Sequence, residues 1–179
     1  MTDAVSAFDC DPMIEPKAFR SCLGQFATGV TVVTTEVDGE KVGLTANSFA
    51  SVSLSPPLVL WSIGMNATSF KTFERADRFA INVLAEDQIL LSKHFGRSGH
   101  DKFASVEWTG GKHGLPILVG VAAFFECDVA SRHQGGDHLI MVGHVRRAVQ
   151  FDRKALVFAQ GRYRVTGDHP EEGVFRSAS

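Results

Sequence analysis

Small polar side chains crowd one stretch of the chain, Thr45-Ala46-Asn47-Ser48-Phe49-Ala50-Ser51-Val52-Ser53. Hydroxyl and amide groups supply both hydrogen-bond donors and acceptors, and short side chains let a ligand approach the backbone closely. A planar heterocycle with a phosphate tail would suit such a surface. A serine- and threonine-rich edge strand with turn caps explains the same residues, so the stretch by itself leaves both interpretations open.

A second polar cluster is the segment His133-Gln134-Gly135-Gly136-Asp137-His138. Its Gly-Gly pair is typical of a hairpin turn, and we expect the two histidines to lie opposite each other across that hairpin. No third ligand follows at a spacing that metal sites use, so we expect no metal here. Two interpretations stay open: a polar hairpin tip, or Asp137 and His138 as hydrogen-bonding groups beside a bound ligand.

The third segment runs from Phe95 to Phe103 and combines cations with aromatic rings. Arg97, Ser98 and Lys102 could neutralise a phosphate, while Phe95 or Phe103 packs on a ring. An ordinary solvated loop is the alternative. The sequence has no GxGxxG after a strand and no Walker A, GxSxG or HExxH motif, so any phosphate site depends on side chains and irregular backbone.

Strands must position most of these groups. β-Branched residues dominate 30–37, and Asp38-Gly39 is a strong two-residue turn because both of its positions adopt positive φ. Folding the chain about this turn places Glu36 opposite Lys41. The remaining pattern predicts strands at 43–53, 58–63, 79–84, 121–133, 138–149 and 155–165, helices at 16–26 and 86–96, a short helix capped by residues 66–69, and a loop at 97–117.

Length and composition restrict the class of protein. The 179 residues suit one domain at 16–165, between a flexible acidic arm at 1–15 and a polar tail at 166–179. The 18 basic residues nearly balance 20 acidic ones, so charge gives no argument for nucleic acid or an anionic membrane. Three cysteines without a CxxC pair indicate neither a disulfide framework nor a thiolate metal site. Without a signal-peptide pattern or an apolar run of ~20 residues, the protein is expected to be cytoplasmic, with no membrane segment.

Taken together and in this order, the three segments resemble the flavin reductase family with the FMN-binding split-barrel fold. This family comprises short-chain NAD(P)H:flavin oxidoreductases that serve two-component flavin-dependent monooxygenases. The resemblance covers residues 16–165 and is carried by Gly29-Val30-Thr31-Val32-Val33-Thr34, the run from Gly43 to Leu58, Phe79-Ala80-Ile81-Asn82-Val83-Leu84, Phe95-Gly96, Asp101-Lys102-Phe103 and Gly136-Asp137-His138. Each motif alone is weak, but together they are specific.

The resemblance implies a mainly β fold: a Greek-key-like antiparallel split barrel with a few short flanking helices. It implies a homodimer that binds FMN or FAD at or near the subunit interface and takes a hydride from NADH, with NADPH as the alternative. Reduced flavin would then pass to a separate monooxygenase component. Two rivals stay open, namely a barrel that keeps FMN tightly bound and reduces another acceptor, and a non-catalytic module that binds flavin or haem.

The resemblance also assigns roles to individual residues. His138 is the expected catalytic residue, near the transferred hydride, and Gly136 and Asp137 belong with it to the nicotinamide site. Lys102 is a candidate phosphate or adenylate contact. The cofactor-binding residues that the resemblance implies, besides those three, are Thr31, Thr45, Ala46, Asn47, Ser48, Ser51, Val52, Ser53, Phe95, Lys102 and Phe103.

Overall fold

The computed structural model describes residues 9, 11–99 and 101–169. Strands hold 47% of the residues and helices 14%, which confirms the predicted mainly β fold with a few short helices. The helices are α1 Pro16–Leu23, α2 Phe70–Arg75 and α3 Ile89–Gly96. The strands are β1 Thr28–Gly29, β2 Thr31–Val37, β3 Glu40–Ala46, β4 Ala50–Leu54, β5 Pro57–Gly64, β6 Arg78–Val83, β7 Trp108–Gly110, β8 Pro116–Leu118, β9 Ala123–Gly135, β10 His138–Gln150, β11 Val157–Ala159 and β12 Arg162–Arg164.

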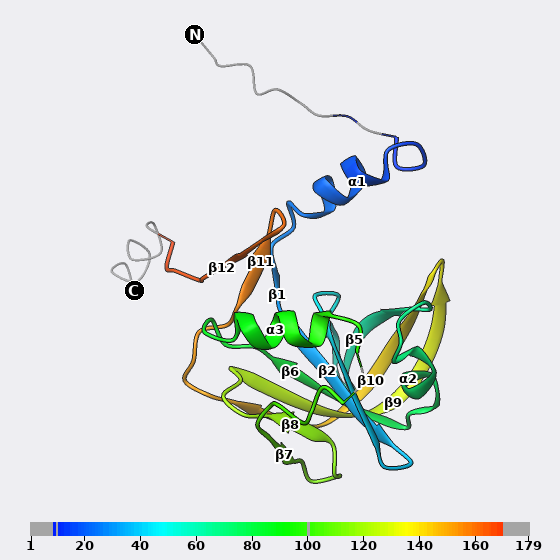
Figure 1. The fold of residues 1–179 in the computed structure, drawn as a ribbon, viewed down its shortest axis with the longest axis vertical. Coiled ribbons are helices and arrows are strands. Elements are labelled where there is room, and N and C mark those ends of the chain that lie inside the picture. Colours follow the sequence, from blue (N-terminus) through cyan, green and yellow to red (C-terminus); the bar gives the residue numbers. More distant parts are fainter. Residues whose placement is uncertain (1–8, 10, 100, 170–179) are drawn as a thin grey trace.

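The main sheet has seven strands in the order β3-β2-β6-β9-β10-β5-β4, and all neighbouring strands are antiparallel (Figure 1). Its centre is covered on both faces. Val32 and Val33, which are successive residues of β2, belong to two different core clusters, as do Ala80 and Ile81 of β6. This double burial explains why residues 30–35 are a continuous run of buried residues and do not alternate with exposed ones.

The predicted hairpin at Asp38-Gly39 is confirmed. Both residues have positive φ, 53° and 81°, as a two-residue turn of this type requires. Glu36 lies opposite Lys41 in the β2–β3 register, and their side chains form an ion pair at 3.3 Å. Local sequence therefore decides this pairing of strands.

Three predicted elements differ from the structure. The strand expected at 43–53 is divided, because residues 47–49 carry the chain from β3 at one edge of the sheet to β4 at the other. The strand expected at 155–165 is the β11–β12 hairpin, since Gln160 and Gly161 turn the chain with φ of 52° and 71°. The loop expected at 97–117 contains β7, which pairs with β8 because residues 116–118 are buried apolar side chains.

Barrel closure is not confirmed, because no strand pairing joins the edge strands β3 and β4 within the described residues. The link between these edges is nevertheless tied to the sheet by a side chain. Ser48 Oγ accepts the backbone N–H of Ser62, on β5, at 2.9 Å and donates to the Ser62 carbonyl at 3.2 Å. The Ser48 hydroxyl therefore bonds the backbone of Ser62 as a neighbouring strand would, at the point where the chain crosses from β3 to β4.

A buried asparagine joins three strands in the core. Asn82, on β6, donates from Nδ2 to the Val32 carbonyl and to Thr34 Oγ1, both at 3.1 Å. Its Oδ1 accepts the backbone N–H of Leu118, on β8, at 2.9 Å. Since the side chain is fully buried, these bonds compensate for the loss of water around a polar group.

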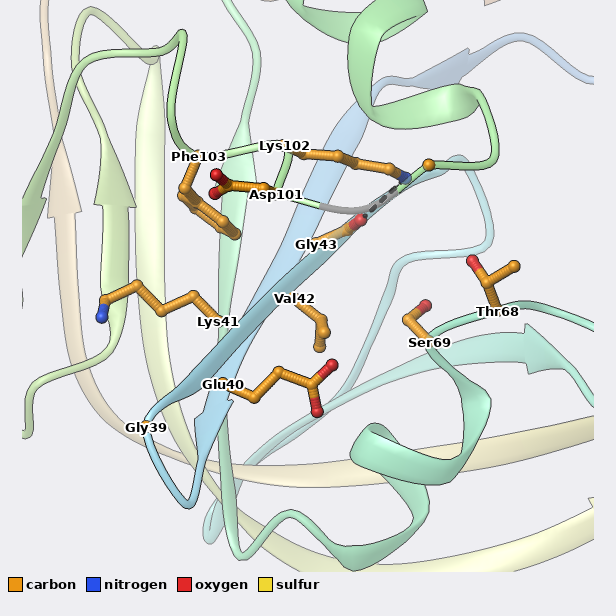
Figure 2. A pocket seen from close by; sticks show the side chains of 11 residues that line it. Gly39, Glu40, Lys41, Val42, Gly43, Thr68, Ser69, Asp101, Lys102 and Phe103 are labelled. Atoms are coloured by element: carbon orange, nitrogen blue, oxygen red, sulfur yellow. Dashed lines mark hydrogen bonds between the residues drawn. The ribbon is translucent and has the colours of Figure 1, made fainter.

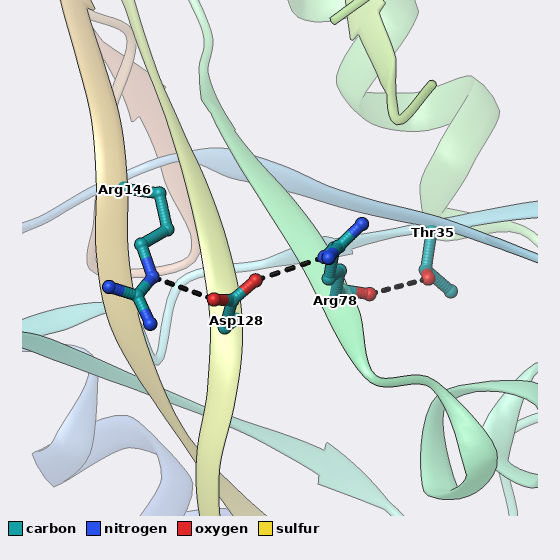
Figure 3. A network of polar contacts seen from close by, with 4 residues as sticks. All are labelled: Thr35, Arg78, Asp128 and Arg146. Atoms are coloured by element: carbon teal, nitrogen blue, oxygen red, sulfur yellow. Dashed lines mark hydrogen bonds and ion pairs between the residues drawn. The ribbon is translucent and has the colours of Figure 1, made fainter. Parts of the chain in front are cut away.

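A charged network crosses β6, β9 and β10 (Figure 3). The Asp128 carboxylate accepts from Arg146 Nε at 2.6 Å and from Arg78 Nε at 3.0 Å, and Thr35 Oγ1 donates to the Arg78 carbonyl at 2.7 Å. The hydrogen bond from Arg146, together with that from Arg78, holds the pKa of Asp128 below its usual value.

Helix α1 lies apart from the main sheet, beyond β1 and the β11–β12 hairpin (Figure 1). The helix is confirmed over Pro16–Leu23, but none of its residues is buried, and Phe19 and Leu23 remain 40% and 58% exposed. Its C-terminal end is held where the Gly24 carbonyl accepts the Gln160 N–H at 2.7 Å. Phe19 and Leu23 therefore belong to neither of the two core clusters.

The predicted arm at 1–15 and tail at 166–179 are only partly visible. Residues 1–8 and 10 of the arm and 170–179 of the tail lie outside the described residues. Among the residues that are described, no helix has the length and apolar character needed to cross a membrane.

Candidate functional site

Strand β5 brings the first two polar segments together. Its residue Ser62 holds Ser48 through the two hydrogen bonds described above, and its residue Gly64 lies opposite His138 in the β10–β5 register. Two residues of a strand span about 6.6 Å. The polar stretch and the His138 hairpin, about 90 residues apart in the sequence by their numbering, therefore border one region of the surface.

Several predicted cofactor-binding side chains are already used by the fold. Thr31 Oγ1 donates to the Ala46 carbonyl and Thr45 Oγ1 to the Ser92 carbonyl on α3, both at 2.7 Å. Ala46 and Phe95 are buried core residues. In this arrangement the hydroxyls of Thr31 and Thr45 are engaged, so a ligand would meet mainly the backbone at these positions.

The other members of the polar stretch face outward. Asn47 and Ser51 are exposed, Ser53 is half-buried, and within the described residues none of the three makes a side-chain hydrogen bond. Val52 is 49% exposed and stands at an irregularity in the β4–β5 register between Ser51 and Ser53. These side chains retain their full hydrogen-bonding capacity for a ligand, which fits a molecule with several polar atoms.

Asp137 and His138 form a pair at the tip of the long β9–β10 hairpin. The turn depends on Gly136, whose φ is 63°, and Asp137 Oδ1 lies 2.7 Å from His138 Nδ1. This hydrogen bond is the main reason that the pKa of Asp137 is lowered. The expected pairing of the two histidines is wrong: His138 faces Gly135, and His133 faces Ile140, because the turn contains two residues rather than four.

A cavity of about 390 Å³ lies between β3, the start of α2 and the segment around Lys102 (Figure 2). Of the predicted site residues, Lys102 and Phe103 line it. Thr68 and Ser69 project into it from the opposite side, and the sequence analysis regarded these two only as helix-capping residues. Ser69, the N-cap residue of α2, makes no side-chain cap to the helix. Since this is a property of the structure, no signal in the sequence identifies the two residues. The full lining is Gly39, Glu40, Lys41, Val42, Gly43, Thr68, Ser69, Gly99, Asp101, Lys102 and Phe103.

Lys102 is one of two lysines that line this cavity, and its ammonium is held by the protein backbone. Nζ donates to the Phe95 carbonyl at 3.0 Å and to the Gly43 carbonyl at 3.3 Å. Burial lowers the pKa of Lys102. The ammonium therefore joins the C-terminal end of α3 to β3, while the side chain forms part of the cavity wall.

An aromatic wall supports the same cavity. Phe95 packs edge-on against Phe103 with ring centroids 5.3 Å apart. Phe103 in turn packs edge-on against Trp108 of β7, with ring centroids 6.1 Å apart. Gly43 is required here, because a Cβ at this position would lie 2.7 Å from the Phe95 ring. Phe95 is thus a buried support for the wall, whereas Phe103 reaches the cavity itself.

Arg97, which the sequence analysis considered for a phosphate, does not contribute to the cavity, and neither does Arg132. Arg97 is exposed and Ser98 beside it is exposed as well, and neither lines the cavity. Arg132, near the Asp137 hairpin, turns to α2 and donates from Nη2 to the carbonyl of Ala76. Lys41 also belongs to the lining, but its ammonium pairs with Glu36 and lies over the Trp108 ring, and in Figure 2 it points away from Lys102.

The arrangement suits the positioning of a ligand better than acid–base or thiol chemistry. Burial raises the pKa of the Cys127 thiol to about 12, so it stays protonated and unreactive near neutral pH. No group of three potential metal-ligating side chains is found among residues 9, 11–99 and 101–169. Unengaged amide and hydroxyl groups, an oriented imidazole and a cavity lined by two lysines and two carboxylates remain. These groups suit the positioning of aromatic cofactors that supply the reactive atoms themselves.

Comparison with known proteins gives the same picture. Residues 23–167 match the model of the flavin reductase like domain. The chain is 43% identical over 162 residues to the flavin-dependent monooxygenase, reductase subunit HsaB of Rhodococcus jostii, covering 90% of this chain and 82% of that protein. It is 46% identical over 147 residues to the FMN reductase (NADH) SmoA of Agrobacterium fabrum, covering 82% and 84%. The Streptomyces globisporus NADH:FAD oxidoreductase SgcE6 in complex with NAD and FAD fragments aligns with a TM-score of 0.86 at 38% identity, over 93% of this chain and 99% of that one.

Proposed function

This chain belongs to the flavin reductase-like family, and from that membership we propose that it is an NADH:flavin oxidoreductase that supplies reduced flavin to a separate monooxygenase component. The relatives named above include a monooxygenase reductase subunit and an FMN reductase that uses NADH. We propose FMN or FAD as the flavin and NADH as the electron donor. The same proposal includes a cytoplasmic location, where NADH is regenerated.

One observation of the structure carries the proposal. Strand β5 holds Ser48 of the polar stretch and pairs with His138, and the chain that leaves β5 leads to Thr68 and Ser69 at the cavity. We propose a single groove in which a tricyclic ring lies beside Asn47 and Ser48 and a phosphate-bearing chain reaches the cavity. His138 would then lie at the ring end of the groove, where the nicotinamide must approach.

When both cofactors are bound, the chemistry is transfer of a hydride from nicotinamide C4 to flavin N5, with one solvent proton completing the reduced flavin. The residues of the chain serve to position the rings. Asn47, Ser51 and Ser53 offer free hydrogen-bonding groups along the groove. Thr68 and Ser69 offer hydroxyls to a phosphate, while Lys102 lends positive charge to the cavity wall. Correct placement of two reacting rings accounts for a large part of the rate in such transfers.

We also propose the homodimer and the split barrel that the resemblance implies. The exposed apolar face of α1 supports the homodimer, because a helix of this length needs a packed face to be stable. The Ser48 bridge supports the barrel, because it ties the link between the two open edges to β5. We propose residues 16–165 as the domain.

The experiment that tests the function is stopped-flow mixing of the purified full chain with NADH and either FMN or FAD. We expect the flavin absorbance to bleach in an NADH-dependent manner under anaerobic conditions. Absence of bleaching with both flavins would contradict the proposal. Flavin that stays bound through gel filtration would instead favour the rival in which FMN is a permanent prosthetic group.

The substitution His138→Ala tests the assignment of the nicotinamide site. We expect it to raise KM for NADH or slow hydride transfer about tenfold or more, with the flavin Kd nearly unchanged. His133→Ala is the matched control, because His133 lies in the same hairpin but faces Ile140 and contacts Ser131 Oγ at 2.8 Å. Loss of flavin binding in His138→Ala, with normal hydride kinetics, would overturn the assignment.

A further inference from the structure

The tip of the β9–β10 hairpin is fixed against the end of β5. The Asp137 carbonyl accepts the Met65 N–H at 3.0 Å, and His138 pairs with Gly64 in the strand register. Backbone contacts on both sides therefore hold the backbone of Asp137 and His138 in place, and the two side chains extend from this fixed backbone.

From this geometry we propose that Asp137 is a positioning residue that, in the neutral imidazole, keeps the proton of His138 on Nδ1 and thereby presents Nε2 as an acceptor to the nicotinamide. This proposal rests on the proposed function. The carboxylate Oδ1 lies 2.7 Å from Nδ1, and an ionised carboxylate is an acceptor only, so Nδ1 must be the donor. The pKa of Asp137 is lowered by this contact, which favours the ionised form. The bond that one ring nitrogen makes determines the role of the other.

The Nε2 side of the ring lies near the backbone of Gly64. A Cβ at residue 64 would lie 3.6 Å from His138 Nε2 and would be crowded by Asn66 Oδ1 at 3.0 Å, so the absence of a side chain matters here. Two hydrogen-bond acceptors, Nε2 and the Asn66 amide oxygen, therefore lie near the same glycine. The carboxamide of nicotinamide carries N–H donors of the kind that such acceptors bind.

A role in stability does not explain the Asp137 side chain. It is 93% exposed, and its contact is with the adjacent residue in the sequence. Exposed pairs of this kind contribute little to the stability of a fold. We therefore expect the contact to act on the orientation of the imidazole, with its measurable effect on the use of NADH.

Two variants separate the hydrogen bond from the charge. Asp137→Asn can still accept from Nδ1–H through its amide oxygen, whereas Asp137→Ala removes the acceptor altogether. The matched control is Asp38→Asn, because Asp38 also stands in a two-residue hairpin turn and pairs with a cation, Arg75, at 3.5 Å. All variants are made in the full chain.

The first measurement needs no activity. In ¹⁵N-labelled protein at a pH where the imidazole is neutral, the chemical shifts of the ring nitrogens should show the Nδ1–H tautomer of His138 in the wild type, Asp38→Asn and Asp137→Asn. In Asp137→Ala we expect a shift toward the Nε2–H tautomer that unrestrained histidine prefers. A wild type with Nε2–H, or an Asp137→Ala tautomer identical to wild type, would overturn the proposal.

The second measurement is steady-state and stopped-flow kinetics. We expect Asp137→Ala to raise KM for NADH or slow hydride transfer about tenfold, Asp137→Asn to have a smaller effect, and the flavin Kd to stay within about twofold. Equal effects of Asp137→Ala and Asp38→Asn would contradict a positioning role. If the wild type itself does not oxidise NADH, the proposed function fails, and the tautomer measurement still decides the Asp137–His138 contact.

Discussion

Lys102 illustrates how a single side chain can be needed by both fold and site. The resemblance makes it a phosphate or adenylate contact, yet its ammonium donates to the carbonyls of Phe95 and Gly43. Hydrogen bonds from a charged donor to a carbonyl contribute about 1.5–3 kcal/mol, so these contacts matter to the stability of the wall. The same residue can still supply positive potential to the cavity that it lines.

At the residue scale, we expect Lys102→Met to lower the free energy of unfolding by about 1–2 kcal/mol and to weaken flavin binding, because the end of α3 loses its tie to β3. Lys102→Arg should retain most of the stability, since a guanidinium can donate to the same carbonyls. Urea denaturation and flavin titration measure both effects, with substitution of the exposed Lys93 of α3, Lys93→Met, as control. Weaker flavin binding at unchanged stability would identify Lys102 as a direct ligand contact.

At the scale of elements, β6 depends on Asn82 to hold β2 and β8. We expect Asn82→Ala to reduce the free energy of unfolding by about 2–4 kcal/mol, because it leaves the Leu118 N–H and the Val32 carbonyl without this buried partner. Asn47→Ala is the matched control, as this asparagine is exposed. A change below about 1 kcal/mol in Asn82→Ala would mean that water or a local shift satisfies these groups.

The network across β6, β9 and β10 predicts a pH dependence (Figure 3). The pKa of Asp128 is lower in the folded chain, so its stabilisation is complete above the ordinary carboxyl pKa of ~3.9 and is lost as pH falls toward the lowered value. We expect the wild type to lose more stability than Asp128→Asn between pH 7 and pH 3, by less than about 1 kcal/mol because the groups are partly exposed. Parallel urea titrations at the two pH values measure this, and identical losses would contradict it.

At the scale of the whole molecule, the segment before β1 exposes more apolar surface than a folded chain usually leaves in water. Met13, Ile14, Phe19, Leu23 and Phe26 are all exposed, from 40% for Phe19 to 91% for Met13. None of the residues of the helix among them is buried, and Figure 1 shows it standing away from the sheet. This surface is the strongest support from the structure for association of two copies.

We therefore expect light scattering with gel filtration to give twice the chain mass for the wild type and a shift to the monomer for Phe19→Ser/Leu23→Ser. The physical reason is the loss of the apolar area that a partner copy would bury. The control Lys17→Ser/Arg20→Ser changes polar residues of the same helix. A monomeric wild type, or a double variant that dimerises as well as the control, would contradict the homodimer.

The sequence by itself determined the structural features that depend on residues close together in the chain. The Asp38-Gly39 hairpin, α1, α3 and the small polar stretch all follow from residue types within a few positions, because turn propensity and periodicity are local properties. The prediction of one strand at 43–53 failed because no residue pattern near 47–49 indicates that these residues cross from one edge of the sheet to the other.

Only the tertiary structure decided which polar groups remain available. Thr31 and Thr45 bond carbonyls 15 and 47 residues away, while Asn47 beside them stays open, and their residue types do not distinguish them. Thr68 and Ser69 became cavity residues because β3 and the Lys102 segment fold against the start of α2. Hydrogen-bond partners are set by which distant strands pair, and that pairing is a property of the packed sheet.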